Sequence, residues 1–224
     1  MDTNNRIRGN NFFYRGEYRK AIEAFDHVIA SEQSDATLHV NRGAAYAALG
    51  EYELAIADYD QAIELDPGHA AAHNNRGLAY AAQGDHESAL KDYELAAEVD
   101  PTDAVIYHNR AASLEGQEDT EGALRDYNRA IELDPEYAQA YYARGSLKAL
   151  MGQELEAIAD FDRAIEFNPR LAAAYYSRGL SLGLQHRYRT ALADFETYLR
   201  LSPRALNREQ VEALVRSMRQ RRSS

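Results

Sequence analysis

The chain has 224 residues, of which 45% are hydrophobic, which is enough apolar side chain to form a packed core. Its 36 acidic and 25 basic side chains give a net charge of -11, which argues against DNA or RNA as the main partner. Because it contains no cysteine, disulfides, thiol nucleophiles and cysteine-based metal sites are excluded.

The two ends of the chain carry separate signals. The opening MDTNNRIRGN lacks a basic segment followed by an apolar run, and nowhere do eighteen apolar residues follow one another. We therefore expect no membrane insertion and a cytoplasmic protein, or a periplasmic one if a signal peptide has been removed. Residues 204–224 carry +4 and the first 203 residues -15. We interpret the basic segment as a solvated helix end, with docking, for example to nucleic acid, as the alternative.

A repeat of 34 residues runs through the chain without insertion or deletion. Each repeat contains two apolar helical patterns separated by a short turn. In the second repeat the helices are predicted over about 36–49 and 53–65, with Gly50 between them. All five prolines stand where the second helix must stop, and Gln33 takes that place in the first repeat. The repeats are residues 2–35, 36–69, 70–103, 104–137, 138–171 and 172–205.

Small and aromatic residues recur at fixed positions, numbered from the start of each repeat. Position 8 is Gly or Ala, position 11 mostly aromatic or Leu, position 20 Ala, position 24 Tyr or Phe, position 27 mostly Ala and position 32 mostly Pro. No strand-like alternation appears, so the predicted class is all-α. The pattern resembles the tetratricopeptide repeat over residues 2–205. The resemblance implies a right-handed superhelical α-solenoid of antiparallel helix pairs, with the first helix of each pair on the concave wall.

Beyond Pro203 the chain departs from the repeat. Residues 206–220, LNREQVEALVRSMRQ, place Val211, Leu214, Val215 and Met218 on one apolar stripe and charged side chains elsewhere. A terminal helix of this kind covers the last repeat and presents a polar face to water. We therefore predict a capping helix over 206–220 and a basic disordered tail over 221–224.

Two charged positions depart from the family pattern in phase with each other. Position 7, usually leucine in the family, is arginine in all six repeats, and position 23 is aspartate in five and Ala24 in the first. We predict structural ion pairs within each repeat, with pairing between neighbouring repeats and a ligand-binding arginine ladder as alternatives. The predicted pairs are Arg42 with Asp58, Arg76 with Asp92, Arg110 with Asp126, Arg144 with Asp160, and Arg178 with Asp194.

The resemblance also implies a peptide groove on the concave wall. Asparagine at position 6 of three successive repeats is similar to the asparagine ladder of O-linked N-acetylglucosamine transferase, where such side chains hold an extended peptide. The alternative is that these asparagines face solvent or cap local turns. Arg6 falls on a position of the carboxylate clamp of chaperone-binding members, but Ala71 and Asn75 replace two of its basic residues. The expected groove residues are Arg6, Asn10, Asn41, Asn75, Asn109, Tyr142, Tyr176 and Leu180.

Motifs for catalysis and cofactor binding are missing from the sequence. There is no phosphate-binding Gly-rich loop, no Gly-x-Ser-x-Gly and no His-Glu-x-x-His. The best metal candidate is His69 with His73, but no third ligand stands at a suitable spacing, so we expect no metal and no cofactor. We predict a non-catalytic adaptor that binds a peptide segment of another protein. The alternative is a structural module that self-associates or docks into a larger assembly through its ends or convex face.

Overall fold

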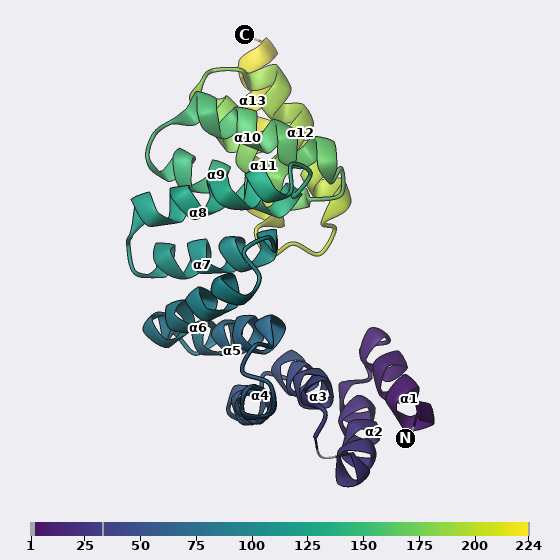
Figure 1. Ribbon diagram of the computed structural model, residues 1–224. Coiled ribbons are helices and arrows are strands. Elements are labelled where there is room, and N and C mark those ends of the chain that lie inside the picture. The colour runs from purple at the N-terminus through teal and green to yellow at the C-terminus, as the bar shows by residue number, and fades with distance from the viewer. Residues whose placement is uncertain (1–2, 33, 224) are drawn as a thin grey trace. The chain divides into compact units, whose positions relative to one another are not determined.

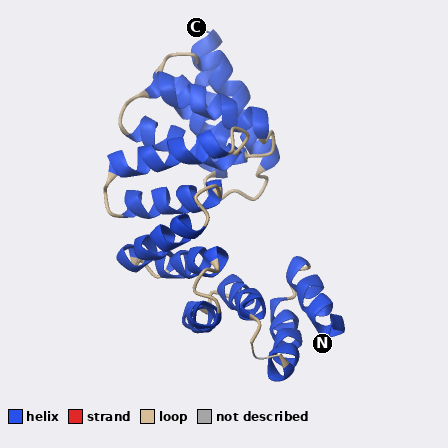
Figure 2. Ribbon diagram, viewed as in Figure 1, coloured by secondary structure: helices blue, strands red, loops and turns tan. Residues whose placement is uncertain are grey.

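The computed structural model describes residues 3–32 and 34–223, and these form helices joined by turns, without a strand (Figures 1 and 2). The predicted all-α repeat class is confirmed, because each repeat contributes two helices. The helices are α1 (Thr3–Tyr14), α2 (Tyr18–Ser31), α3 (Ala36–Ala48), α4 (Tyr52–Leu65), α5 (Ala70–Ala82), α6 (His86–Val99), α7 (Ala104–Gly116), α8 (Thr120–Leu133), α9 (Ala138–Leu150), α10 (Glu154–Phe167), α11 (Ala172–Leu184), α12 (Tyr188–Leu201) and α13 (Arg208–Ser223).

The chain divides into an N-terminal half, residues 1–123, and a C-terminal half, residues 124–224. In the N-terminal half, α1 packs on α2, α3 on α4 and α5 on α6, and each second helix also contacts the first helix of the next repeat. First helices contact one another as well: α1 with α3, α3 with α5 and α5 with α7, and in the C-terminal half α9 with α11. Each half therefore has a wall made of neighbouring first helices.

Glycine at position 8 allows the two helices of a repeat to approach closely. A Cβ built on Gly77 would lie 2.8 Å from Cε1 of Tyr93, and one on Gly43 would lie 2.7 Å from Cε1 of Tyr59. Both rings are buried, so they fill the space beside the small residues at positions 8 and 20. The aromatic side chain at position 24 and the glycine at position 8 therefore form one packing unit.

The turn between the two helices of a repeat uses the left-handed backbone region at position 15. The residues there are Gly16, Gly50, Gly84 and Gly152, with φ from 74° to 81°, and Glu118 and His186, with φ of 63° and 56°. Glycine enters this region without a steric penalty, whereas other residues are strained in it. Repeats four and six thus keep the turn geometry although they lack glycine.

Helix α13 covers the last repeat. Val211 and Val215 are buried in a cluster with Leu182, Leu192 and Phe195, whereas Leu214 of the predicted stripe is 36% exposed. The helix begins at Arg208 and continues to Ser223, so residues 221–223 are helical where we expected a disordered tail, and Ser224 lies outside the described residues. The segment contains no glycine or proline that would end it earlier. Gln33, predicted to replace the proline in the first repeat, also lies outside the described residues.

Candidate functional site

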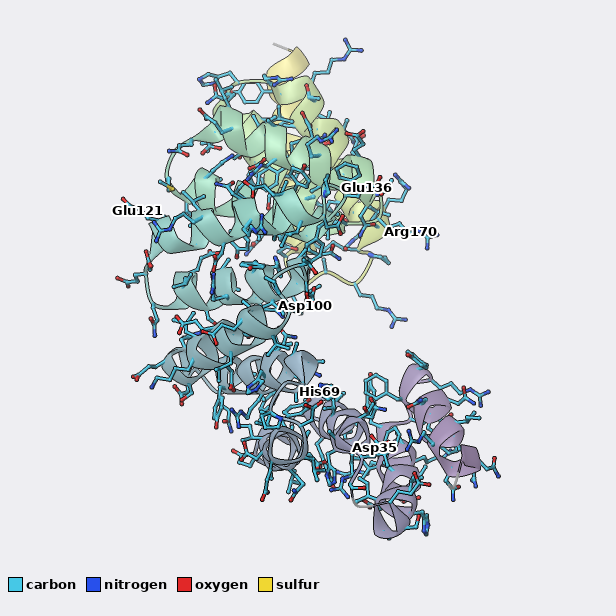
Figure 3. The ribbon with its side chains drawn as sticks, viewed as in Figure 1. Asp35, His69, Asp100, Glu121, Glu136 and Arg170 are labelled. Carbon is cyan, nitrogen blue, oxygen red and sulfur yellow. The ribbon has the colours of Figure 1, made fainter. Side chains whose placement is uncertain are left out.

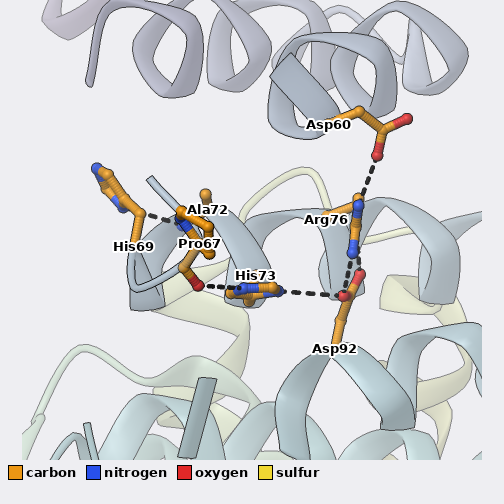
Figure 4. A network of polar contacts seen from close by, with 7 residues as sticks. All are labelled: Asp60, Pro67, His69, Ala72, His73, Arg76 and Asp92. Atoms are coloured by element: carbon orange, nitrogen blue, oxygen red, sulfur yellow. Dashed lines mark hydrogen bonds and ion pairs between the residues drawn. The ribbon is translucent and has the colours of Figure 1, made fainter. Parts of the chain in front are cut away.

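The arginine at position 7 joins two repeats. In the third repeat, Nε of Arg76 donates to Oδ2 of Asp92 at 2.8 Å and Nη2 donates to Oδ1 of Asp92 at 2.6 Å (Figure 4). The remaining Nη1 donates to Oδ1 of Asp60 on α4, in the preceding repeat, at 2.6 Å. The hydrogen bonds that Arg76 donates to Asp92 raise the pKa of Arg76 further above its usual range, although burial opposes this. Arg76 therefore remains charged, with a buried carboxylate on one side and an exposed one on the other.

Three further arginines have the same two-sided geometry. Each donates to the residue sixteen positions later, in its own repeat, and to the residue sixteen positions earlier, in the preceding repeat. Arg110 lies in the N-terminal half and Asp126 in the C-terminal half, so their pairing stays a prediction. The arrangements are Arg42 with Asp58 and Asp26, Arg144 with Asp160 and Asn128, and Arg178 with Asp194 and Asp162.

The acceptor at position 25 of the preceding repeat was missed in the sequence. Asp26, Asp60, Asn128 and Asp162 occupy this position, and it is the constant spacing of sixteen residues before each arginine that would have identified them. A periodic charge pattern predicts that two positions face each other. Exposed acidic residues on a second helix are common, however, and are usually interpreted as solvated surface, so position 25 was not singled out.

The two histidines considered as metal ligands instead hold local structure. His69 is the residue before α5, and its Nδ1 accepts from the backbone N–H of Ala72 at 3.3 Å. His73 is buried, with Nδ1 at 3.4 Å from Oδ1 of Asp92 and Nε2 at 3.1 Å from the carbonyl oxygen of Pro67 (Figure 4). In later repeats, hydroxyls of Tyr107 and Tyr175 donate to the equivalent proline carbonyls at 3.3 Å. His73 is therefore part of the contact between repeats.

Two hollows lie on the first-helix wall of the N-terminal half. One, of about 80 Å³, is lined by Asn10, Phe13, Tyr14, Phe25, Asn41 and Ala44. The other, of about 200 Å³, is lined by Ala44, Ala47, Tyr52, Tyr59, Asn75, Leu78 and Ala79. Ala44 lines both hollows, so they are neighbours along α1, α3 and α5, and no charged side chain lines either of them.

The predicted asparagines form two short hydrogen-bonded groups. Asn41 donates from Nδ2 to Oδ1 of Asn10 at 3.4 Å. Asn109 donates to Asn74 at 3.0 Å, and Asn74 donates in turn to Asn75 at 3.3 Å. Asn74 stands one position before the predicted ladder and was missed, because nothing in the repeat pattern distinguishes a buried amide from an exposed one. The structure thus joins Asn10 to Asn41 and, through Asn74, Asn75 to Asn109.

Arg6 lies outside the two hollows that contain the asparagines. Its Nη2 is 2.6 Å from Oδ2 of Asp35 and 3.1 Å from Oε2 of Glu32, and it lines a separate hollow of about 790 Å³ at the turns before α3 and α5, where Figure 3 labels Asp35 and His69. Burial alone would raise the pKa of Asp35, but the hydrogen bond from Arg6 holds it below its usual value. Arg6 is engaged by two carboxylates, which leaves its guanidinium poorly placed to grip a peptide terminus.

Of the groove residues predicted in the C-terminal half, the two tyrosines pack against aromatic side chains of the second helices. The ring of Tyr142 lies 6.1 Å from that of Phe161, and the ring of Tyr176 lies 5.1 Å from that of Tyr198. Leu180 is 40% exposed. Two leucines at position 13 of their repeats are more exposed than any of these: Leu150 at 83% and Leu184 at 66%. The apolar surface of this half therefore belongs mainly to leucines and only secondarily to tyrosines.

Within residues 3–32 and 34–223, no helix is long and apolar enough to cross a membrane. In the same residues, no three His, Asp or Glu side chains are grouped so that they could hold a metal ion.

Comparison with known proteins agrees with the repeat architecture. A TPR repeat model matches residues 9–50, 45–84 and 116–152, and tetratricopeptide repeat models match residues 70–103 and 138–171. No curated protein sequence matches the chain. Solved structures do. A crystal structure of MamA is 25% identical, with a TM-score of 0.63, over 72% of this chain and 94% of MamA.

Two other solved structures are also similar to this chain. YrrB, described as a TPR protein with an unusual peptide-binding site, is 25% identical over 86% of this chain and 99% of its own, with a TM-score of 0.61. Yeast Tom70, at 19% identity, shares the fold over 91% of this chain and 44% of its own, with a TM-score of 0.76. The repeat models, the helix pairs and these neighbours lead to one conclusion: the chain belongs to the tetratricopeptide repeat family and is a protein–protein interaction module.

Proposed function

We propose that the first-helix wall of the N-terminal half binds an extended peptide segment of a partner protein, so that the protein acts as a non-catalytic adaptor. The observation that carries this proposal is the pair of neighbouring hollows along α1, α3 and α5, which share Ala44 in their lining. Small alanines leave room for a guest backbone at this point, and the exposed ring of Tyr14, at 85%, offers an apolar contact at one end.

The chemistry of the wall favours a peptide backbone as the ligand. A side-chain amide donates and accepts at once, so it pairs with a peptide group without regard to the guest side chain. Asn10 and Asn41 are 3.4 Å apart, a long hydrogen bond that leaves further donor and acceptor capacity for a guest. Because no charged side chain lines the hollows, we expect the segment that binds there to carry small, uncharged side chains.

The C-terminal half contributes a second apolar surface. Exposed Leu180 and Leu184 lie on α11, and Leu150 lies on α9, which contacts α11. Large exposed apolar side chains on neighbouring helices are typical of protein interaction surfaces. The peptide-binding site named for YrrB, which is similar over nearly its whole length, is further support for peptide recognition by this chain.

The proposal is tested with peptides selected from a displayed random library on the wild-type protein. Their affinity is then measured by fluorescence anisotropy. Ala44→Phe places a bulky side chain in the lining that the two hollows share, and we expect it to abolish binding. The double variant Asn41→Ala/Asn75→Ala removes two amides at about 1 kcal/mol each, so we expect a loss of about thirtyfold.

Ala57→Phe is the matched control, since Ala57 is exposed on α4 and lines neither hollow. It should leave the affinity unchanged, and circular dichroism should show that all three variants are folded. If the selected peptides bind Ala44→Phe as tightly as the wild type, the first-helix wall is not the peptide site.

A further inference from the structure

Asn74 is a buried amide on α5 that lies beside the peptide wall without lining it. Its side chain is 9% exposed and borders neither of the two hollows, whereas the next residue, Asn75, lines the larger one. A buried amide is costly unless its oxygen and its N–H groups are paired. Asn74 satisfies both through hydrogen bonds to two other asparagines, Asn109 and Asn75.

These hydrogen bonds run in one direction across the wall. Nδ2 of Asn109, on α7 of the fourth repeat, donates to Oδ1 of Asn74 at 3.0 Å. Nδ2 of Asn74 donates in turn to Oδ1 of Asn75 at 3.3 Å. Because the oxygen and the nitrogen of an amide lie on opposite sides of its Cγ, the atom that accepts on one side leaves the nitrogen to donate on the other. Asn109 therefore orients Asn74, and Asn74 orients Asn75.

The nitrogen of Asn75 is the atom left for the hollow. Its oxygen is turned toward Asn74, and within the described residues its Nδ2 donates to no protein acceptor. The other described residues of this lining supply alanine, leucine and tyrosine side chains, of which only the hydroxyls of Tyr52 and Tyr59 are polar. The hollow therefore offers N–H donors at Asn75, and the group that complements them is an acceptor such as a peptide carbonyl oxygen.

The smaller hollow repeats this arrangement. Nδ2 of Asn41 donates to Oδ1 of Asn10 at 3.4 Å, and both residues line the hollow. The bond again runs from a later repeat to an earlier one, as the bond from Asn109 to Asn74 does. Each hollow thus contains one asparagine whose oxygen is engaged by a neighbouring asparagine.

We propose that Asn74 is a positioning residue, which turns the amide of Asn75 so that its N–H groups face the hollow and bind a backbone carbonyl of the guest. This inference rests on the proposed peptide site and specifies the group that the site recognises. An unrestrained amide would present either its oxygen or its nitrogen. Fixing its orientation before the guest arrives reduces the conformational entropy lost on binding.

Asn75→Asp tests which group of the guest is recognised, because it replaces the N–H₂ group by an oxygen of nearly the same size. An oxygen that faces a guest carbonyl repels it, so we expect the selected peptides to bind this variant about tenfold more weakly or worse. Asn75→Ala should cost about fivefold. Gln61→Glu adds the same charge at an exposed position of α4 outside both hollows and should leave the affinity unchanged. If Asn75→Asp binds as tightly as Asn75→Ala or more tightly, the proposal is wrong.

Asn74→Asp tests the positioning role. The new carboxylate still accepts from Asn109 but cannot donate, so Asn75 should turn, donate to it and present its oxygen to the guest. We expect a loss of about fivefold or more, and no further loss when residue 75 is alanine. Asn74→Leu removes the restraint without adding a charge and should cost about two- to threefold, again only in the presence of Asn75. An equal loss in both backgrounds would mean that Asn74 acts on the structure in general and would overturn the proposal.

A measurement without peptide separates this inference from the proposed function. The side-chain amide resonances of Asn75 in the ¹⁵N-labelled full chain are identified by their loss in Asn75→Ala. In Asn74→Asp one of the two protons should move downfield, because it then bonds to a carboxylate. Unchanged resonances would contradict the orientation assigned to Asn75. If instead the resonances shift but Ala44→Phe leaves the peptide affinity unchanged, the orientation is right and the peptide site is wrong.

Discussion

At the scale of a residue, Asp92 shows why Arg76 stands before Gly77. This carboxylate is 2% exposed, and a buried charge is costly unless it is paired and hydrogen-bonded. Arg76 approaches it with two parallel N–H groups, a geometry that lysine cannot provide. Gly77 meanwhile leaves space for the ring of Tyr93. Arg76 and Gly77 thus make two contacts with the same helix, α6: one with Asp92 and one with Tyr93.

The contacts of Arg76 with its two carboxylate partners, Asp92 and Asp60, should differ sharply in their contribution to stability. Arg76→Ala leaves Asp92 buried without its cation, so we expect a loss of about 3–5 kcal/mol in the free energy of unfolding, measured by urea denaturation. Asp60→Ala removes an exposed partner, whose side chain is 54% accessible, and should cost about 0–1 kcal/mol. Similar losses for the two variants would contradict the distinction between the buried and the exposed contact.

At the scale of an element, the turn of each repeat is defined by its left-handed residue. Glu118 adopts a φ of 63° at the position where four other repeats have glycine. A residue with a Cβ is strained there, and the strain is compensated by the packing of the helices on either side.

The predicted helices over 36–49 and 53–65 agree with α3 and α4 to within a residue, because caps, glycine and proline mark the helix ends locally.

Glu118→Gly should therefore stabilise the protein. Relief of the left-handed strain is worth about 1 kcal/mol, partly offset by the greater freedom of glycine in the unfolded chain. The reciprocal change, Gly84→Ala, places a Cβ at a φ of 81° and should destabilise the protein by about 1 kcal/mol or more. Thermal unfolding followed by circular dichroism measures both. A lower midpoint for Glu118→Gly than for the wild type would show that its side chain contributes more than the strain costs.

At the scale of the whole molecule, the two halves differ in net charge. The N-terminal half has nine basic and 23 acidic side chains, a net of -14, whereas the C-terminal half has 16 and 13, a net of +3. The acidic half contains the neutral, asparagine-lined hollows, so its negative charge lies outside the proposed peptide site. The C-terminal half ends in α13, whose apolar face protects the last repeat from water.

Removing the apolar face of α13 should unfold the C-terminal end first. Val211 is fully buried, so Val211→Asp places a charge in the cluster of Leu182, Leu192 and Phe195, and we expect a loss of about 3–5 kcal/mol. Hydrogen exchange should show lower protection in α11 and α12, with α3 and α4 unchanged, because repeats depend mainly on their neighbours. Leu214→Asp is the control, since Leu214 is 36% exposed. Uniform loss of protection along the chain would instead indicate one cooperative unit.

The sequence by itself determined the period, the all-α class, the helix pairs and the residues that pair with arginine inside a repeat. These depend on local spacing, which a periodic pattern records directly. Only the tertiary structure decided which acceptor in the preceding repeat each arginine reaches, that Arg6 is held by Asp35 and Glu32, and that Asn74 links Asn75 to Asn109. These contacts depend on distances between helices from different repeats, and a side chain with several possible partners selects one through packing, which no single repeat encodes.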